Sequence, residues 1–451
     1  MPNILRIHGW KSSKTHESGP EVVIEAEYIE PAKACVKCGV IGNLYRHGTK
    51  RMKFRDTPIY GKPCVIEATV QRYKCRACGE TFMPEINGVE VDRRMTTRLV
   101  SYITQQCLRD TFTNVARHVG CVEGTIRNIA GDHIDALADT FEPYLPDWLG
   151  LDETKLDGAQ RCVITDIIAH RPIDILIDRD KRTVTNWLWQ FRKQTNLRGL
   201  SIDMWRPYLD AARAVFPGLP VVIDRFHVVR MANNGLDKVR IRVQKTKTKA
   251  TRIDWKRSKV QLMKRPKNLT DKQRFNLQMW LDNEPEIAEA YRIKEAFFDL
   301  YDMQKADGIA AYDAFADTIP KDMKADFKEL LTATKNWREE ILAFFDHPIS
   351  NGYTEALNGV AKVINRSGRG YSFEVLRARL LYGSKRGFTK PLPLETCWSC
   401  GGKFEETMPQ ADHIVPVGET TMPANALRIC AACNQRFHTG GASEHQSPST
   451  P

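Results

Sequence analysis

The sequence predicts a multidomain protein of the α/β class, and three observations lead to this prediction. The chain has 451 residues, which is too long for one hydrophobic core and indicates roughly three or more domains. Eight of its 12 cysteines fall in CxxC pairs, a spacing typical of structural zinc sites. The hydrophobic periodicity changes along the chain from strand-like to helical and back, which indicates successive units of different architecture.

The charge balance of the chain favours a polyanionic partner. The formal net charge is +12 and the hydrophobic content is 42%, so we expect a folded protein whose leading partner is nucleic acid. The first 21 residues lack the apolar stretch of a signal peptide, and no later run has the length of a membrane span. We therefore expect a cytoplasmic protein that uses its paired cysteines for metal rather than for disulfides.

Residues 1–90 form the first predicted unit, a zinc-binding module of short strands. The knuckles "CVKCG" and "CRACG" supply four thiolates for one tetrahedral structural zinc, and the ligands are Cys35, Cys38, Cys75 and Cys78. Between the knuckles, "RHGTKRMKFRD" is a strand-like segment rich in Arg and Lys. This segment is either a solvated basic face or a direct phosphate contact, and the sequence leaves both interpretations open.

Residues 91–145 are predicted to form a helix-turn-helix. Apolar residues recur at helical spacing in "TFTNVARHVG" and "CVEGTIRNIAGDHIDAL", with Thr111 as an N-cap and Gly120 as the turn. The second helix of such a pair enters the major groove of DNA. Here it is expected to begin near Glu123, and its candidate DNA-contacting residues are Thr125, Arg127 and Asn128.

Residues 146–235 change to short apolar runs with two helices between the later ones. The order strand, strand, strand, helix, strand, helix, strand is that of a ribonuclease-H-like sheet. Residues 236–348 are expected to form a basic and helical insertion, since positions 238–267 hold 13 Lys or Arg and one acid. Residues 349–388 would then supply the last helices of the interrupted domain.

Three acids carry the candidate chemistry of this domain. Asp152 is expected to end the first strand in "GLDET", Asp203 to end the fourth strand in "SIDMW", and Glu355 to lie early in the helix "SNGYTEALNGVAK". Carboxylates that converge at strand ends hold Mg²⁺ ions, which activate an attacking oxygen and stabilise a leaving oxygen of a phosphodiester. Asp224 in "VVIDRFHVVR" is the alternative second acid because it too ends an apolar strand.

The blocks "GLDET", "SIDMWRPY", "VVIDRFHVVR" and "SNGYTEALNGVAKVINRSGRGYSFEVLRARLL" resemble the ISL-three family of bacterial insertion-sequence transposases. The resemblance covers about residues 30 to 382. It implies a DDE transposase that binds terminal inverted repeats, cleaves DNA with Mg²⁺ (or Mn²⁺) and joins the freed 3′-OH to target DNA. It assigns the metal-binding roles to Asp152, Asp203 and Glu355. It also implies phosphate contacts by Lys362 and Arg366, a homo-oligomer, no membrane association and a place near the bacterial nucleoid.

The tail of the chain departs from that family pattern. Residues 389–440 contain a second zinc-spaced set and "DHIVP", an order similar to the HNH endonuclease family and its small ββα module. The resemblance implies His413 as general base and Asp412 and Asn434 as ligands of a divalent ion. Residues 441–451 are polar and are expected to be disordered. The ligands of this second structural zinc would be Cys397, Cys400, Cys430 and Cys433.

Two alternatives to the transposase remain open at this stage. One is a DNA-binding regulator that acts through its zinc and helix-turn-helix modules and keeps an inactive catalytic fold. The other is an HNH endonuclease in which the tail is the main catalyst and the rest of the chain targets it to DNA. The intact set of acids argues against the regulator, and the long helical insertion argues against a role limited to targeting.

Overall fold

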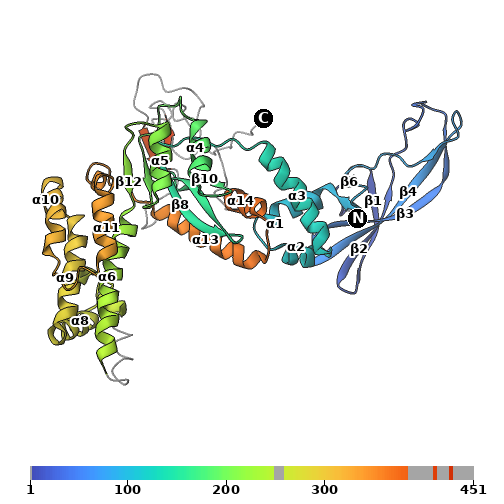
Figure 1. Ribbon diagram of the computed structural model, residues 1–451. Helices are drawn as coiled ribbons and strands as arrows, with labels where there is room; N and C mark the ends of the chain where they lie inside the picture. Colours follow the sequence, from blue (N-terminus) through green and yellow to red (C-terminus); the bar gives the residue numbers. More distant parts are fainter. Residues whose placement is uncertain (1–2, 248–258, 384–409, 414–425, 430–451) are drawn as a thin grey trace, which may run out of the picture. The chain divides into compact units, whose positions relative to one another are not determined.

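The computed structural model describes residues 3–247, 259–383, 410–413 and 426–429 of the chain (Figure 1). The chain groups into two compact units. The first unit takes in Met1–Glu142 and Val363–Gly387, and the second takes in Pro143–Lys362 and Phe388–Pro451. In the described residues, no helix is both long enough and apolar enough to cross a membrane.

The first unit is built on a twisted sheet in the strand order β1-β2-β4-β3-β7-β6, with β5 paired to β4. Its longest strands are β3 and β4, joined by the two-residue turn Tyr60-Gly61. Both turn residues have positive φ angles, 52° and 76°, as expected of a type I′ turn, whose twist matches that of the paired strands. The strands are β1 Trp10–Ser18, β2 Glu21–Tyr28, β3 Leu44–Ile59, β4 Lys62–Cys75, β5 Thr81–Phe82, β6 Val89–Glu90 and β7 Met95–Thr96.

The helix-turn-helix follows the sheet, as the sequence predicts. Its helices are α1 Thr97–Cys107, α2 Phe112–Val119 and α3 Glu123–Asp139. The Thr111 side chain caps α2 by accepting a hydrogen bond from the backbone N–H of Asn114 at 3.3 Å. Gly120 ends α2 in the left-handed conformation with φ 72°, which a glycine adopts without steric cost. The later helix α14, Phe373–Tyr382, belongs to the same unit and packs against α3.

The second unit contains a five-stranded sheet in the order β10-β9-β8-β11-β12. The strand β9 is antiparallel to both of its neighbours, whereas β8, β11 and β12 are parallel to one another. The order of elements along the chain is the predicted one, with helices before and after β11. The elements are β8 Trp148–Leu156, β9 Ala159–Asp166, β10 Arg171–Leu176, α4 Lys181–Trp189, β11 Gly199–Ile202, α5 Arg206–Val215 and β12 Val221–Ile223.

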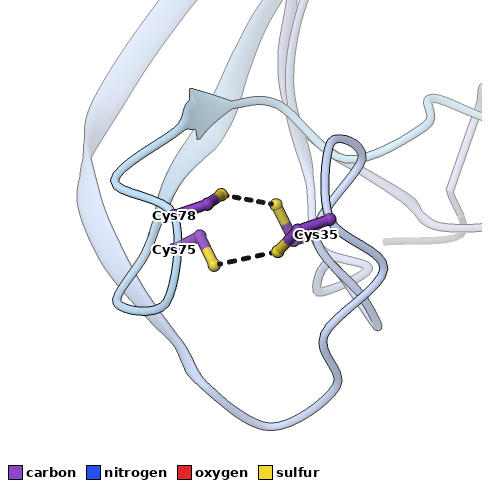
Figure 2. A group of neighbouring side chains, drawn as sticks. Cys35, Cys75 and Cys78 are labelled. Carbon is purple, nitrogen blue, oxygen red and sulfur yellow. Dashed lines mark hydrogen bonds between the residues drawn. The ribbon is translucent and has the colours of Figure 1, made fainter.

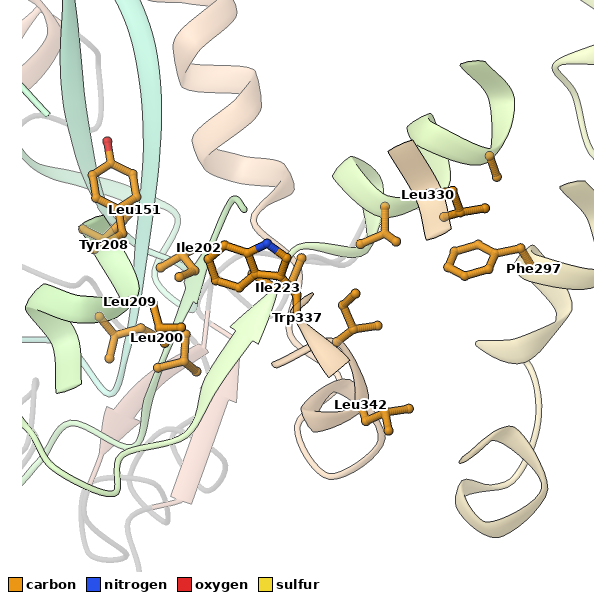
Figure 3. Packing of buried hydrophobic residues seen from close by; sticks show 14 of the residues in the cluster. Leu151, Leu200, Ile202, Tyr208, Leu209, Ile223, Phe297, Leu330, Trp337 and Leu342 are labelled. Carbon is orange, nitrogen blue, oxygen red and sulfur yellow. The ribbon is translucent and has the colours of Figure 1, made fainter. Parts of the chain in front are cut away.

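Helices follow this sheet in the chain. The helix α6, Arg225–Thr246, begins directly after β12 and continues without a break past residue 236, where the sequence suggests the start of the insertion. One hydrophobic core joins the sheet to these helices: Figure 3 shows Ile223 of β12 near Trp337, and Phe297 near Leu330. The next α-helices of this unit are α8 Asp271–Asn283, α9 Pro285–Leu300, α10 Lys305–Phe315, α11 Lys328–Asn336 and α12 Arg338–Leu342. Short 3₁₀ turns lie at Pro266–Asn268, Ala316–Thr318 and Ala343–Phe345, and α13 begins at Gly352.

Candidate catalytic site

Three aspartates form one row at an edge of the five-stranded sheet. Asp152 lies on β8, whereas Asp203 and Asp224 directly follow β11 and β12. Leu151 pairs with Ile202, and Ile202 pairs with Ile223, so the next residue on each strand is one of the aspartates. Because the three strands are parallel and in register, the aspartates lie at one level, where β11 and β12 end. Asp152 itself lies in the middle of β8, which continues to Leu156, so the prediction that it ends the first strand was wrong. The fold thus brings both predicted aspartates and the alternative Asp224 together.

The helix α13, Gly352–Gly368, places Glu355 beside this row. The backbone N–H of Asn351, just before α13, donates to Oδ1 of Asp224 at 3.3 Å, and the Asn351 side chain donates to the carbonyl of Leu151 at 3.2 Å. Nearly two turns into the helix, Asn358 Nδ2 donates to Oδ2 of Asp152 at 2.8 Å. These three hydrogen bonds tie the start of α13 to β8 and to the end of β12.

A glycine on β8 permits the close approach of α13. A Cβ atom at Gly150 would lie 2.4 Å from Asn351 Oδ1, 2.5 Å from Thr165 Oγ1 and 2.7 Å from Thr354 Oγ1. The hydroxyl groups of Thr165 and Thr354 are themselves hydrogen-bonded at 2.6 Å in the buried interface. Any larger residue at position 150 would push the helix that carries Glu355 away from the sheet.

Burial and mutual repulsion make the acids unusually weak. Burial, together with the nearby charges of Asp224 and Glu355, raises the pKa of Asp152 to about 7, and Lys362 and Arg230 partly oppose this rise. Burial also raises the pKa of Asp203 to about 7, with an added contribution from Asp152. The Glu355 pKa is raised by burial and by Asp224. Each carboxylate is therefore costly to ionise unless positive charge is brought to the site.

Three buried oxygen atoms of the site have no hydrogen-bond partner among the described residues: Asp203 Oδ1, Asp224 Oδ2 and Asn358 Oδ1. Asp203 is 9% exposed and Asp224 is fully buried. A buried acceptor without a donor is costly, so such atoms indicate a missing ligand, water or ion. Carboxylate and amide oxygens are the ligands that Mg²⁺ prefers, and the chemistry of these donors fits a divalent cation.

The predicted zinc ligands of the first unit come together as a compact group. The sulfur atoms of Cys35 and Cys78 lie 3.6 Å apart, and those of Cys38 and Cys75 lie 3.7 Å apart. Figure 2 shows how Cys35, Cys75 and Cys78 face one another. Tetrahedral zinc with Zn–S bonds of about 2.3 Å separates its sulfurs by about 3.8 Å. The four thiol sulfurs all lie within 4.8 Å of one another, and among the described residues this is the group of Cys, His, Asp or Glu side chains that could hold a metal ion. The geometry fits one structural zinc.

The predicted DNA-contacting residues lie on the first turns of α3. Arg127 and Asn128 are exposed and Thr125 is half-buried. The Arg127 guanidinium pairs with Glu123 at 2.8 Å, one turn earlier on the same helix, and lies over the Phe112 ring. An exposed pair of this kind contributes little to stability, so Arg127 remains available to a more strongly charged partner.

The predicted residues of the tail fall largely outside the described part of the chain. Asp412 and His413 belong to the short strand β13, Gln410–His413, which pairs antiparallel with β14, Ala426–Ile429. The residues Cys397, Cys400, Cys430, Cys433 and Asn434 lie outside the described residues, so the predicted second zinc site and HNH-like module stay predictions. Arg366 lies near the end of α13, and its phosphate contact is likewise untested.

The prediction missed Asn351 and Asn358, which the structure places at the site. A signal for them was present, because Asn351, Glu355, Asn358 and Lys362 recur at alternating spacings of four and three residues. That spacing places polar residues along one face of a helix. Arg230 on α6 was also missed, and it offsets the negative charge of Asp152 and Glu355.

Comparison with known proteins identifies the family. A family model described as a transposase matches residues 149–380. The zinc-finger of transposases IS204, IS1001, IS1096 and IS1165 matches residues 31–78, and the helix-turn-helix domain of transposase family ISL3 matches residues 85–134. The transposase for insertion sequence element IS1001 of Bordetella parapertussis is 24% identical over 374 residues, which are 76% of this chain and 87% of that protein.

A second relative is the transposase for insertion sequence element IS1557 of Mycobacterium tuberculosis, which is 21% identical over 372 residues, 75% of this chain and 82% of its own length. The matched regions follow the order zinc finger, helix-turn-helix and transposase domain that the structure shows for the described residues. The family model for the transposase domain spans all four acids of the candidate site. The chain belongs to the ISL3 family of insertion-sequence transposases.

Proposed function

We propose that this transposase is of the DDE type and that Asp152, Asp203 and Glu355 are its metal-binding acids on a ribonuclease-H-like fold. The observation that carries the proposal is the row of buried aspartates at one sheet edge, with Glu355 facing it from α13. The strand order β10-β9-β8-β11-β12, with only β9 antiparallel to its neighbours, is consistent with the ribonuclease-H-like sheet expected from the order of elements.

Two Mg²⁺ ions bound by these acids would activate the attacking oxygen and stabilise the leaving oxygen of the DNA phosphodiester. The residues of the chain prepare for this chemistry. Asp152 is the central acid, because Asp224 and Glu355 raise its pKa and it raises the pKa of Asp203 in turn. The Asp152 carboxylate could therefore bind both ions, one together with Asp203 and the other together with Glu355.

The cations around the site have a separate role. Lys362 and Arg230 lower the pKa values of Asp152 and Glu355, and Arg179 lowers that of Asp203. Positive side chains at the edge of a site that handles phosphodiesters are suited to hold the phosphates of the bound strand. Lys362 lies about two helical turns after Glu355 on α13, so it would contact DNA next to the metal-binding acids.

The two chemical steps of the proposal use one site in turn. Water first attacks the phosphodiester at an element end and releases a 3′-OH, and the strand that leaves carries the 5′-phosphate. The 3′-OH then attacks a phosphodiester of the target DNA, which forms one bond and breaks one bond, so the number of phosphodiesters is conserved. Because the reaction joins two element ends in one event, we further propose that the protein acts as a homo-oligomer.

The test uses purified full-length protein, Mg²⁺ and a duplex that carries the inverted repeats flanking the coding region. Asp152→Asn, Asp203→Asn and Glu355→Gln are compared with Asp166→Asn, the control. Asp166 is a buried acid of the same sheet that pairs with Leu149 on β8 and accepts a hydrogen bond from Tyr144. We expect the three site variants to lose cleavage and joining by at least about a thousandfold.

The same assay separates the alternatives. His413→Ala keeps full cleavage and joining if the proposed acids catalyse both steps, and it abolishes cleavage if the tail is the main nuclease. Persistent joining in Glu355→Gln contradicts the proposal, and DNA binding by the wild-type protein without any cleavage favours the regulator. Zinc content and the melting temperature of each variant show whether it has folded.

A further inference from the structure

The basic strand between the two zinc knuckles continues into a groove beside the helix-turn-helix. Arg51, Lys53 and Arg55 alternate on β3 with Met52, Phe54 and Asp56. Phe54 and Asp56 are fully buried, whereas Arg51 and Lys53 are exposed and Arg55 is half-buried. Because side chains alternate between the two faces of a strand, the three basic residues lie on the outward face of the sheet.

The turn of the helix-turn-helix closes against the end of this basic face. A Cβ atom at Gly120 would lie 2.6 Å from Nη1 of Arg55 and 2.8 Å from Cβ of Pro63. The absence of a side chain at Gly120 therefore lets the turn between α2 and α3 contact strands β3 and β4 directly (Figure 1). The sheet and the helix expected to contact DNA form one continuous surface in this unit.

Between them lies a groove of about 520 Å³. Four cations line it from the sheet side, Lys53, Arg55, Arg93 and Arg94, and one acid, Glu21, lines it with them. The other side is formed by the turn and by Thr125 of α3, one of the residues that the sequence predicts to contact DNA. The charge of the lining groups favours an anion next to the helix that enters the major groove.

The ion pairs of the groove leave its cations open to exchange. Lys53 pairs with Glu67 at 2.8 Å and Arg55 pairs with Glu21 at 2.9 Å, and the four side chains are between 32% and 74% exposed. Pairs this exposed contribute roughly 0–1 kcal/mol, so a phosphate can replace either acid at little cost. Arg93 has a structural role instead, because its ion pair with Asp132 at 2.5 Å joins α3 to the sheet.

Arg94 carries the most direct evidence. It is exposed and has no ion-pair partner among the described residues. Its φ angle is 53°, in the left-handed region that is costly for a residue with a long side chain. Its carbonyl accepts a hydrogen bond from the N–H of Arg55 at 2.8 Å, which fixes Arg94 beside the basic face of β3. Its N–H donates to the carbonyl of Val91 at 3.1 Å, so Arg94 closes the turn between β6 and β7 and lines the groove with an exposed cation.

We propose that this groove binds backbone phosphates of the DNA duplex that α3 contacts, with Arg94, Lys53 and Arg55 as the phosphate ligands. The zinc-bearing sheet then acts as a second arm of the DNA-binding surface and fixes the position of α3 on the duplex. This inference rests on the proposed function only for the identity of the DNA, because phosphate contacts carry no sequence information. Of the two interpretations of the "RMKFR" segment, the proposal takes direct phosphate contact.

The test measures equilibrium binding of the full-length protein to a duplex of random sequence over a series of salt concentrations, without Mg²⁺. Each phosphate contact contributes about 0.9 to the slope of log affinity against log salt. We expect Arg94→Asn and Lys53→Gln each to lower the slope by about 0.9. Asparagine at position 94 tolerates the left-handed conformation, so that variant changes the charge and preserves the backbone.

The matched control is Lys11→Gln, which removes the same charge from the exposed start of β1, away from the lining of the groove. It is expected to keep the wild-type slope. An unchanged slope in both groove variants overturns the inference, and so does an equal fall in Lys11→Gln, which would reflect bulk charge alone. Because this assay involves neither cleavage nor element ends, its outcome is independent of whether the chain proves to be a DDE transposase.

Discussion

Asn358 donates a hydrogen bond from its side-chain Nδ2 to Oδ2 of Asp152 at 2.8 Å, and this bond joins helix α13 to strand β8. The other oxygen of Asp152 accepts the N–H of Glu153 at 2.7 Å. The carboxylate that we place at the centre of the metal site is thus held at both oxygens. Since Asn358 lies one turn after Glu355, the same helix supplies one acid and orients another.

We predict that Asn358→Ala weakens the site without removing an acid. Residues that orient metal ligands typically contribute 10- to 100-fold to metal affinity or activity. The Mg²⁺ concentration needed for half-maximal cleavage should therefore rise by about that factor, with less change in the rate at saturating Mg²⁺. Val360→Ala, on the exposed part of the same helix, is the control. A fall in rate that saturating Mg²⁺ does not restore would indicate a role in the chemical step instead.

The stability of the protein should depend on pH through Asp152 and Asp203. Both have a folded-state pKa raised from 3.8 to about 7. A raised carboxyl pKa means that the folded state binds the proton more tightly, so its stabilising contribution is present below pH 3.8 and is lost as the pH rises through about 7. Without Mg²⁺, the two buried charges should make the protein less stable at pH 8 than at pH 5.5.

Adding Mg²⁺ should reverse this loss, because a cation that binds only the folded state stabilises it by mass action, about 2.7 kcal/mol at 100 times its dissociation constant. Thermal unfolding with and without Mg²⁺ measures the effect, which is expected to be large at pH 8 and small at pH 5.5. Asp152→Asn should abolish the Mg²⁺-dependent shift; an equal shift in that variant would show that Mg²⁺ binds elsewhere.

Replacing Asp224 should change the stability of the protein, because its side chain supports the start of α13. Oδ1 of Asp224 accepts the backbone N–H of Asn351 at the start of α13. Asp224→Asn keeps that acceptor and removes the charge, whereas Asp224→Ala leaves a buried N–H unpaired, which costs about 1–3 kcal/mol. We therefore expect the alanine variant to be less stable than the asparagine variant by about that amount, measured by denaturant unfolding.

The cleavage rates of the same variants decide between the two candidate acids. We expect Asp224→Asn to retain more cleavage than Asp203→Asn, because Asp224 supports the helix that carries Glu355 while Asp203 is the proposed metal ligand. If Asp224→Asn loses cleavage as completely as Asp203→Asn does, Asp224 shares the metal and the assignment of the second acid must be extended to it.

Local patterns were enough to predict much of this fold. The two zinc knuckles, the N-cap at Thr111, the turn at Gly120 and the start of α3 at Glu123 all follow from short-range chemistry, and the structure confirms each of them. The order of strands and helices from β8 to β12 was also predictable, because buried strands and amphipathic helices differ in hydrophobic period. These features depend on residues that are close in sequence.

The contacts of the site depend on residues that are far apart in sequence, and those were not predictable. Asn358 and Asp152 are separated by 206 positions, so nothing in the local pattern shows that they meet. The continuation of α6 from β12 past residue 236 was missed for a related reason: its buried face includes Arg240, whose guanidinium pairs with Asp237. A basic residue in a sequence suggests a solvated surface, and only the tertiary structure shows where its stem is buried.

Gly120 lies where the helix-turn-helix contacts the sheet, so we expect a mutation there to disturb both parts of the proposed DNA-binding surface. Its φ of 72° and the short distances from its virtual Cβ to Arg55 and Pro63 both oppose a side chain. The Arg55 guanidinium can move, but the Pro63 ring is part of β4. We predict that Gly120→Ala destabilises the protein by roughly 1–3 kcal/mol and weakens duplex binding, because the turn moves away from the sheet. Thermal unfolding and the salt-dependent binding assay measure the two effects.

Gly124→Ala is the matched control for that variant. Gly124 lies on α3 only four positions later, and a Cβ there meets nothing within 4 Å. Alanine is favoured over glycine in a helix by about 1 kcal/mol, so this variant should be as stable as the wild type or more so. If Gly120→Ala binds random duplex with the wild-type affinity and salt slope, the sheet and α3 do not act as one surface. A loss of binding confined to Gly120→Ala is the result that joins the zinc-bearing sheet to DNA recognition.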